Sequence, residues 1–219
     1  MMIYLLSILI FLAIVAATWF MGLWSNLLTL INLILAAMIA TNIYEPICDA
    51  IERSGGEGMT YLLDFLILWG VFVVVFVLLR LGTDLLSKFQ VKFNFVVELI
   101  GRSVLSIWIA ITFLSFALFT LHTAPLPVTP FGGFQASPES KGLDRLWLGF
   151  AQSRSRGAFA EFRNGWFLPE YKEEEHPKDA GKNRRVFDSK SDFIFKYHDR
   201  RRLFKEQEGF TVKKPVPSS

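Results

Sequence analysis

Two long apolar runs, joined by a charged segment, dominate the first half of the chain. Residues 61–79 hold a single acid, Asp64, close to their start, and residues 103–121 hold no charged side chain. Each run has 19 residues. A helix of that length spans about 28 Å, close to the ~30 Å hydrocarbon core of a bilayer. An uncharged run this long exceeds an ordinary strand and is too apolar for a surface helix. The pattern predicts a transmembrane hairpin.

Two further apolar runs precede this hairpin. No Lys or Arg comes before residues 3–20, so the positive region of a signal peptide is missing and we expect a retained first span. Residues 27–44 form the second span, in which Asn32 is expected to bond across to another helix. Pro46 and the glycines after it predict a loop over residues 45–60. The fold class is therefore an all-α membrane domain of four transmembrane helices over residues 1–122.

The segment between the last two spans, residues 81–97, has an apolar stripe at helical spacing with lysines on other faces. This pattern predicts an amphipathic connector that lies in the membrane interface with its lysines in water. The residues expected at that interface are Leu85, Lys88, Phe89, Lys92 and Phe93.

Two pairs of opposite charge lie four residues apart at the ends of this connector. Arg80 precedes Asp84, and Glu98 precedes Arg102. That spacing makes both pairs candidate ion pairs on one helix face. The alternative is two solvated surface pairs worth a few tenths of a kcal/mol.

The chain changes character after the last apolar run. Residues 123–138 are rich in proline and glycine and predict an extended linker, and residues 139–219 form a polar, aromatic-rich and partly ordered tail. Short helices are expected near residues 143–150 and 189–206. Trp147, Trp166 and Phe167 are the candidate partner contacts, because aromatic residues are enriched at interfaces. The alternative is that they form a small core within the tail.

Charge supports this division and suggests an orientation. The chain is 52% hydrophobic with a mean hydropathy of +0.38 and a net charge of +3. Only five of its 23 Lys and Arg residues precede residue 123. Residues 80–102 hold four of these five and residues 45–64 hold one, so the positive-inside rule places the connector in the cytoplasm. The tail and the N-terminus are then expected outside, and no nucleic-acid partner is expected.

The sequence offers no recognisable catalytic or metal motif. It has no phosphate-binding glycine loop, nucleophile elbow or HExxH motif, and His122, His176 and His198 lie far apart. Asp64 is interpreted as an acid at the membrane boundary, since a central Asp would cost about 2.5–3.5 kcal/mol. We therefore expect no catalytic residue, no cofactor and no metal, and a protein that is not an enzyme.

Four spans in about 122 residues, with a short first turn and a basic connector, resemble the colicin V production (CvpA) family of small bacterial inner-membrane proteins. The most similar stretches are residues 22–46 and 81–114, especially VVELIGRSVLSIW at residues 96–108. The family's Arg-Gly pair after the first span corresponds to Met21-Gly22, and its Asp-Arg-x-x-Gly motif corresponds to Val97, Glu98 and Gly101.

The resemblance implies a multi-pass protein of the bacterial inner membrane with an accessory or scaffold role in toxin production and secretion or in cell-envelope maintenance. Its partners would be the lipid bilayer and either further copies of the chain or an envelope or secretion protein. The alternative is a small oligomeric membrane transporter or channel subunit, since four short helices in one protomer are too few to enclose a wide pore.

Overall fold

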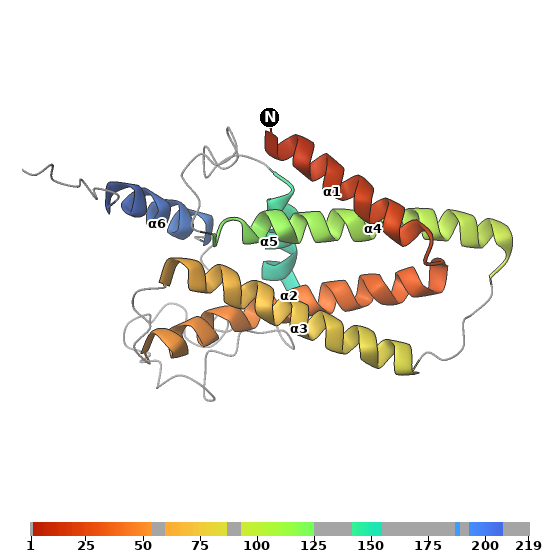
Figure 1. Ribbon diagram of the computed structural model, residues 1–219, viewed down its shortest axis with the longest axis horizontal. Helices are drawn as coiled ribbons and strands as arrows, with labels where there is room; N and C mark the ends of the chain where they lie inside the picture. The colour runs from red at the N-terminus through yellow and green to blue at the C-terminus, as the bar shows by residue number, and fades with distance from the viewer. Residues whose placement is uncertain are drawn as a thin grey trace, which may run out of the picture.

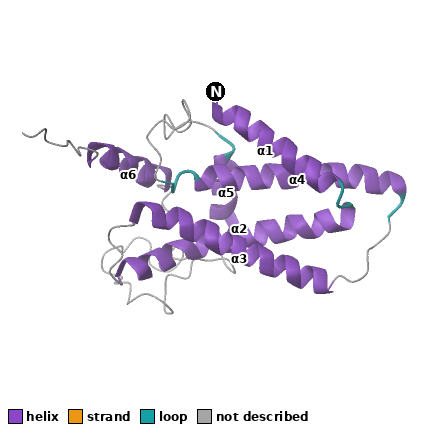
Figure 2. Cartoon of the chain, viewed as in Figure 1, coloured by secondary structure: helices purple, strands orange, loops and turns teal. Residues whose placement is uncertain are grey.

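The computed structural model describes residues 2–53, 60–86, 93–124, 142–154, 187–188 and 193–207. These residues form six helices, and no strand is found among them (Figure 2). The helices are α1 (Met2–Trp19), α2 (Leu23–Arg53), α3 (Thr60–Leu86), α4 (Phe95–Thr120), α5 (Asp144–Arg154) and α6 (Phe193–Gln207).

The three longest helices run side by side along the long axis of the molecule (Figure 1). α1 crosses α4 obliquely, and the short α5 lies across the bundle against α4 (Figure 1). One end of the bundle holds the α1–α2 turn, the end of α3 and the start of α4. The opposite end holds the start of α3, the end of α4 and, beyond them, α6 (Figure 1). We call the first of these the junction end and the second, where α6 lies, the clasp end.

Three helices are long and apolar enough to cross a membrane: Leu23–Ile51, Leu62–Leu86 and Phe95–Thr120. α1 differs from these three in holding no charged residue, but it is shorter, with its apolar part at Ile3–Trp19. The prediction of an all-helical membrane domain is confirmed at this level. Of the four predicted spans, three meet the length and hydropathy that crossing requires.

The second predicted span ends later than expected. Pro46 lies inside α2, which continues to Arg53. Proline removes one helical hydrogen bond and favours a break. However, Tyr44 and Cys48 on either side of it are only 0% and 3% exposed, so packing on both sides of Pro46 keeps the helix together. The predicted loop over residues 45–60 is therefore wrong in its first part.

The predicted connector also has different boundaries. α3 continues through Leu86, and α4 begins at Phe95, where the Asn94 side chain accepts a hydrogen bond from the amide of Val96. The two ends of the predicted connector therefore belong to α3 and α4. At the α3 end, polar side chains bond to α2, and the helix continues past them. Residues 87–92, including Lys88, Phe89 and Lys92, lie outside the described residues. Of the other predicted interface residues, Leu85 and Phe93 are both exposed.

The centre of the bundle combines small residues with aromatic rings. α2 packs closely on its neighbours through Ala36, Ala37 and Ala40, all fully buried, as small residues allow in membrane helices. Aromatic side chains from α3 and α4 fill the remaining space, with Phe72 and Phe116 at a ring-centroid distance of 4.7 Å. The same hydrophobic cluster continues into α5 and α6 through Trp147, Leu148, Ala151, Phe193, Ile194 and Tyr197. The two short helices predicted in the tail are present, and they pack on the membrane domain.

Candidate functional site: a polar clasp that joins α6 to the membrane helices

A chain of hydrogen bonds links three helices at the clasp end. The Tyr197 hydroxyl on α6 donates to Asp64 Oδ2 on α3 at 2.9 Å. The same hydroxyl lies 3.3 Å from the Tyr44 hydroxyl on α2, which in turn donates to Glu45 Oε1 at 3.3 Å. Two carboxylates on different helices are thus connected through two tyrosine hydroxyls.

Each of these carboxylates also meets a cation from α6. Arg200 donates to Asp64 Oδ2 and forms an ion pair with it. The Lys196 ammonium lies 3.3 Å from Glu45 Oε1. Lys196 and Arg200 are four residues apart, so they share one face of α6 with Tyr197 between them. We call the six residues Tyr44, Glu45, Asp64, Lys196, Tyr197 and Arg200 the clasp.

Burial determines the electrostatics of the clasp. Asp64 is only 7% exposed and Tyr197 only 2%. Burial raises the pKa of the Tyr197 hydroxyl well above its ordinary value of 10.0, and the negative charge of Asp64 raises it further. Tyr197 therefore stays neutral and keeps its proton to donate to Asp64. A buried carboxylate needs such partners, because an unpaired charge in this environment is costly.

The position of Asp64 near the start of α3 agrees with its interpretation as an acid at the membrane boundary. Its partners were not foreseen, because they lie 133 and 136 residues further along the chain. The tail that supplies them was expected only to be polar, aromatic-rich and partly ordered. The sequence offered one signal, the two cations Lys196 and Arg200 four residues apart.

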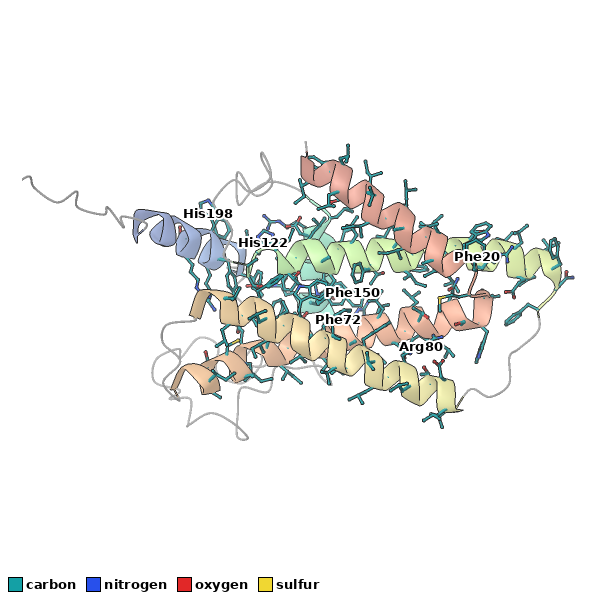
Figure 3. The ribbon with its side chains drawn as sticks, viewed as in Figure 1. Phe20, Phe72, Arg80, His122, Phe150 and His198 are labelled. Atoms are coloured by element: carbon teal, nitrogen blue, oxygen red, sulfur yellow. The ribbon has the colours of Figure 1, made fainter. Side chains whose placement is uncertain are left out.

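A second buried pair lies beside the clasp. His122 Nε2, just after α4, is 2.9 Å from Asp144 Oδ2 at the start of α5, and their side chains are 3% and 8% exposed (Figure 3). Arg145 Nε lies 3.6 Å from the same carboxylate oxygen. The pair holds the start of α5 against the end of α4. Sequence spacing did not reveal it, since the two residues lie 22 positions apart, on either side of a stretch rich in proline and glycine.

Trp147 has its partners within the chain. Its indole Nε1 donates to Thr41 Oγ1 on α2 at 3.1 Å, and its ring meets Phe116 of α4 edge-on at 5.4 Å. The side chain is 3% exposed. It therefore forms neither a core within the tail nor an exposed partner contact in this structure. Trp166 and Phe167, the other two predicted contacts, lie outside the described residues.

The junction end contains the two predicted ion pairs, and only one is formed. Arg80 Nε lies 3.1 Å from Asp84 Oδ2, and the guanidinium also donates to Thr29 and Ser25 on α2 (Figure 3). Asn32 on α2 likewise donates to Thr83 on α3 at 2.9 Å, which confirms its predicted role between helices.

The predicted pair between Glu98 and Arg102 is not formed. Glu98 Oε1 instead accepts the amide hydrogen of Leu23 at 2.7 Å. The first amides of a helix have no partner within the helix and carry partial positive charge, so the start of α2 attracts this carboxylate. The Arg102 guanidinium lies over the Trp19 ring, 5.1 Å from its centroid. Helix packing thus gives Glu98 a partner in the Leu23 amide, and this contact replaces the predicted pair with Arg102, one turn away.

The described residues contain no group of three or more His, Cys, Asp or Glu side chains arranged to hold a metal ion. The arrangement at the clasp neutralises two acids and fastens a helix.

The fold and this site define a class, an all-helical membrane protein whose C-terminal helix is tied to its spans by charge. Searches of protein-family models, curated proteins and solved structures give no match to this chain.

Proposed function

We propose that this chain is a non-enzymatic scaffold or accessory factor of the bacterial inner membrane, acting in cell-envelope maintenance or in toxin production and secretion. The observation that carries the proposal is the clasp. Asp64 and Glu45 are acids that a transporter or an enzyme could use, and both are engaged with Tyr and cationic side chains that join helices. Such contacts shape a surface for a partner rather than a site for a substrate.

The resemblance to the CvpA family is part of the proposal, and one feature of the junction end supports it. The two stretches on which the resemblance rests meet in space, because Glu98 accepts a hydrogen bond from the amide of Leu23. Gly22 has φ +77°, which favours glycine, and a Cβ on Gly101 would come within 2.5 Å of Leu23 Cδ1. The glycines at both motif positions thus have a packing reason.

The proposed orientation places the junction end in the cytoplasm and the clasp end outside. Arg80, near the end of α3, and Arg102, near the start of α4, lie toward the junction end, whereas the acidic start of α3 and the helix α6 lie at the opposite end. α1 is the proposed fourth span. Its 18 residues reach about 27 Å, slightly less than the ~30 Å hydrocarbon core.

A transporter or channel subunit is the second candidate, and the buried face of α2 favours it. Asn26 and Asn42 are 0% and 3% exposed, and the side-chain oxygen of each has no hydrogen-bond partner among the described residues. Buried amides that keep a spare acceptor in a membrane helix are typical of functional sites. The transport candidate requires these buried oxygens to become accessible to a solute path, which an oligomer would complete.

Reconstitution separates these two candidates. The full chain in liposomes is expected to show no flux of small ions or of an encapsulated dye beyond that of protein-free vesicles. In cells, the wild-type chain and an Asn42→Leu variant are both expected to restore detergent resistance to a strain that lacks the protein. A flux that depends on Asn42 would refute the scaffold proposal and support the transport alternative. Failure of the wild-type chain to restore resistance would remove the envelope role.

A further inference from the structure

Arg102, near the start of α4, differs from the cations described above. Arg80 and Arg200 each meet a carboxylate within the chain. Arg102 makes no hydrogen bond or ion pair with any described residue, and its Nε atom is buried. Glu98, one turn away, is directed to the amide of Leu23 instead. A guanidinium beside a hydrocarbon layer is costly unless an anion neutralises it. Arg102 therefore lacks a counter-ion that its surroundings demand.

The contact with Trp19 keeps this guanidinium in place. Trp19 is the last residue of α1, and Arg102 lies over its ring at 5.1 Å from the centroid. An arginine stacked on an aromatic face still presents its N–H edge, which matches the geometry of a phosphate. Tryptophan is also the side chain most typical of the boundary between lipid tails and headgroups. The pair thus combines a free set of donors with a marker of headgroup depth.

The surface around the pair is strongly apolar. Phe20, in the α1–α2 turn, is 85% exposed, and Phe95, at the start of α4, is 75% exposed (Figure 3 labels Phe20). The exposed apolar surface continues along both helices toward the bilayer centre through Leu9, Leu12, Ile100, Val104 and Ile107. A soluble phosphate or an acidic peptide would gain nothing from these side chains. A lipid would place its acyl chains along them.

We propose that Arg102 and Trp19 form a binding site for the phosphate group of an anionic phospholipid, whose acyl chains lie along the exposed faces of α1 and α4. The lipid phosphate supplies the negative charge that Arg102 lacks. A second negative charge or a glycerol headgroup adds hydrogen-bonding capacity that a choline headgroup does not have. Basic positions between membrane helices are a known way of holding anionic headgroups. This site lies at the opposite end of the bundle from the clasp and does not depend on the proposed scaffold function.

Native mass spectrometry of the full chain in a neutral detergent tests the proposal. The probes are dioctanoyl phosphatidylglycerol, dioctanoyl phosphatidylcholine and inorganic phosphate, each titrated separately. Phosphatidylglycerol is expected to bind at the lowest concentration. Loss of one charge-assisted contact corresponds to about a tenfold weakening or more, which is the expectation for Arg102→Gln. Arg154→Gln, at an exposed arginine of α5, is the matched control and should bind as the wild type does.

Three outcomes would overturn the lipid site: unchanged phosphatidylglycerol binding by Arg102→Gln, equal binding of phosphatidylcholine, or displacement of the lipid by a similar concentration of inorganic phosphate. Two further measurements protect against a variant that fails to fold. Trp19→Leu should weaken binding while keeping the apolar surface. A photoreactive acyl chain on phosphatidylglycerol should label α1 and the first half of α4 of the wild-type chain. Labelling concentrated on α5 or α6 instead would refute the site without any variant.

Discussion

Replacing Asp64 with asparagine is the sharpest perturbation of the clasp. The variant keeps an oxygen that accepts from Tyr197 but removes the negative charge that faces Arg200. The Asp64 and Arg200 side chains are 10% and 21% exposed in this pair. Breaking a fully buried pair costs about 3–5 kcal/mol, and a hydrogen bond to a charged group contributes about 1.5–3 kcal/mol. Since Arg200 keeps some contact with its surroundings, we expect a loss of about 2–3 kcal/mol.

Hydrogen exchange of the α6 amides measures this loss directly. If α6 detaches locally, its amides exchange in proportion to the population of the open form. A loss of 2–3 kcal/mol then speeds exchange by roughly 30- to 140-fold. The measurement uses the full chain in lipid nanodiscs, and the amides of α2 and α4 serve as internal references because they should not change. The effect should be confined to α6 and to the segment of α3 around Asp64.

Asp84→Asn is the matched control on the same helix. Asp84 also pairs with an arginine, but its side chain is 52% exposed, and Arg80 retains its bonds to Thr29 and Ser25. Exposed pairs contribute about 0–1 kcal/mol, so this variant should leave α6 unchanged. Combining Asp64→Asn with Arg200→Gln should cost less than the sum of the single changes, because the two residues act as a pair. If α6 exchanges no faster in Asp64→Asn than in Asp84→Asn, the clasp does not hold the helix.

Three other substitutions test separate parts of the structure. Gly22→Ala should destabilise the chain by about 1–2 kcal/mol in detergent unfolding, because φ at this position is +77°. Gly70→Ala, in open space within α3, should be neutral or stabilising. Equal effects of the two substitutions would contradict this reasoning. In the wild type, the population of the open form of α6, obtained from exchange after correction for the intrinsic amide exchange rate, should be constant up to about pH 10 and rise above it, since the raised pKa of Tyr197 favours the protonated folded form. Tyr197→Phe should remove the tyrosine part of that rise, and an identical pH profile would be evidence against it. Trp147→Ala should lower the free energy of unfolding by about 3–5 kcal/mol and expose the α5 amides to exchange. Leu146→Ala, at a 57% exposed position, should leave these amides protected. Similar exchange in both variants would show that the indole does not anchor α5.

Hydropathy and residue spacing along the chain were enough to predict the membrane helices and the contacts within or beside them. The hydropathy and the length of a helix are properties of one continuous segment. The segments around Asn32, Phe72 and Phe116 could therefore be recognised as membrane helices without knowing how they pack. The inward role of Asn32 followed from the cost of leaving an amide in lipid. The pair of Arg80 and Asp84 followed from spacing along one helix. The helical periodicity around Trp147 predicted α5 for the same reason.

Tertiary structure determined the partners of Glu98 and Asp64. Glu98 had a cation one turn away, yet it bonds to the start of α2, because helix packing brought an unpaired amide closer. Asp64 bonds to Tyr197 and Arg200 on α6 because this helix lies against the start of α3. Such pairings join residues that are distant in sequence and depend on how whole helices pack. Periodicity and hydropathy are properties of single segments, so they contain no information about these contacts.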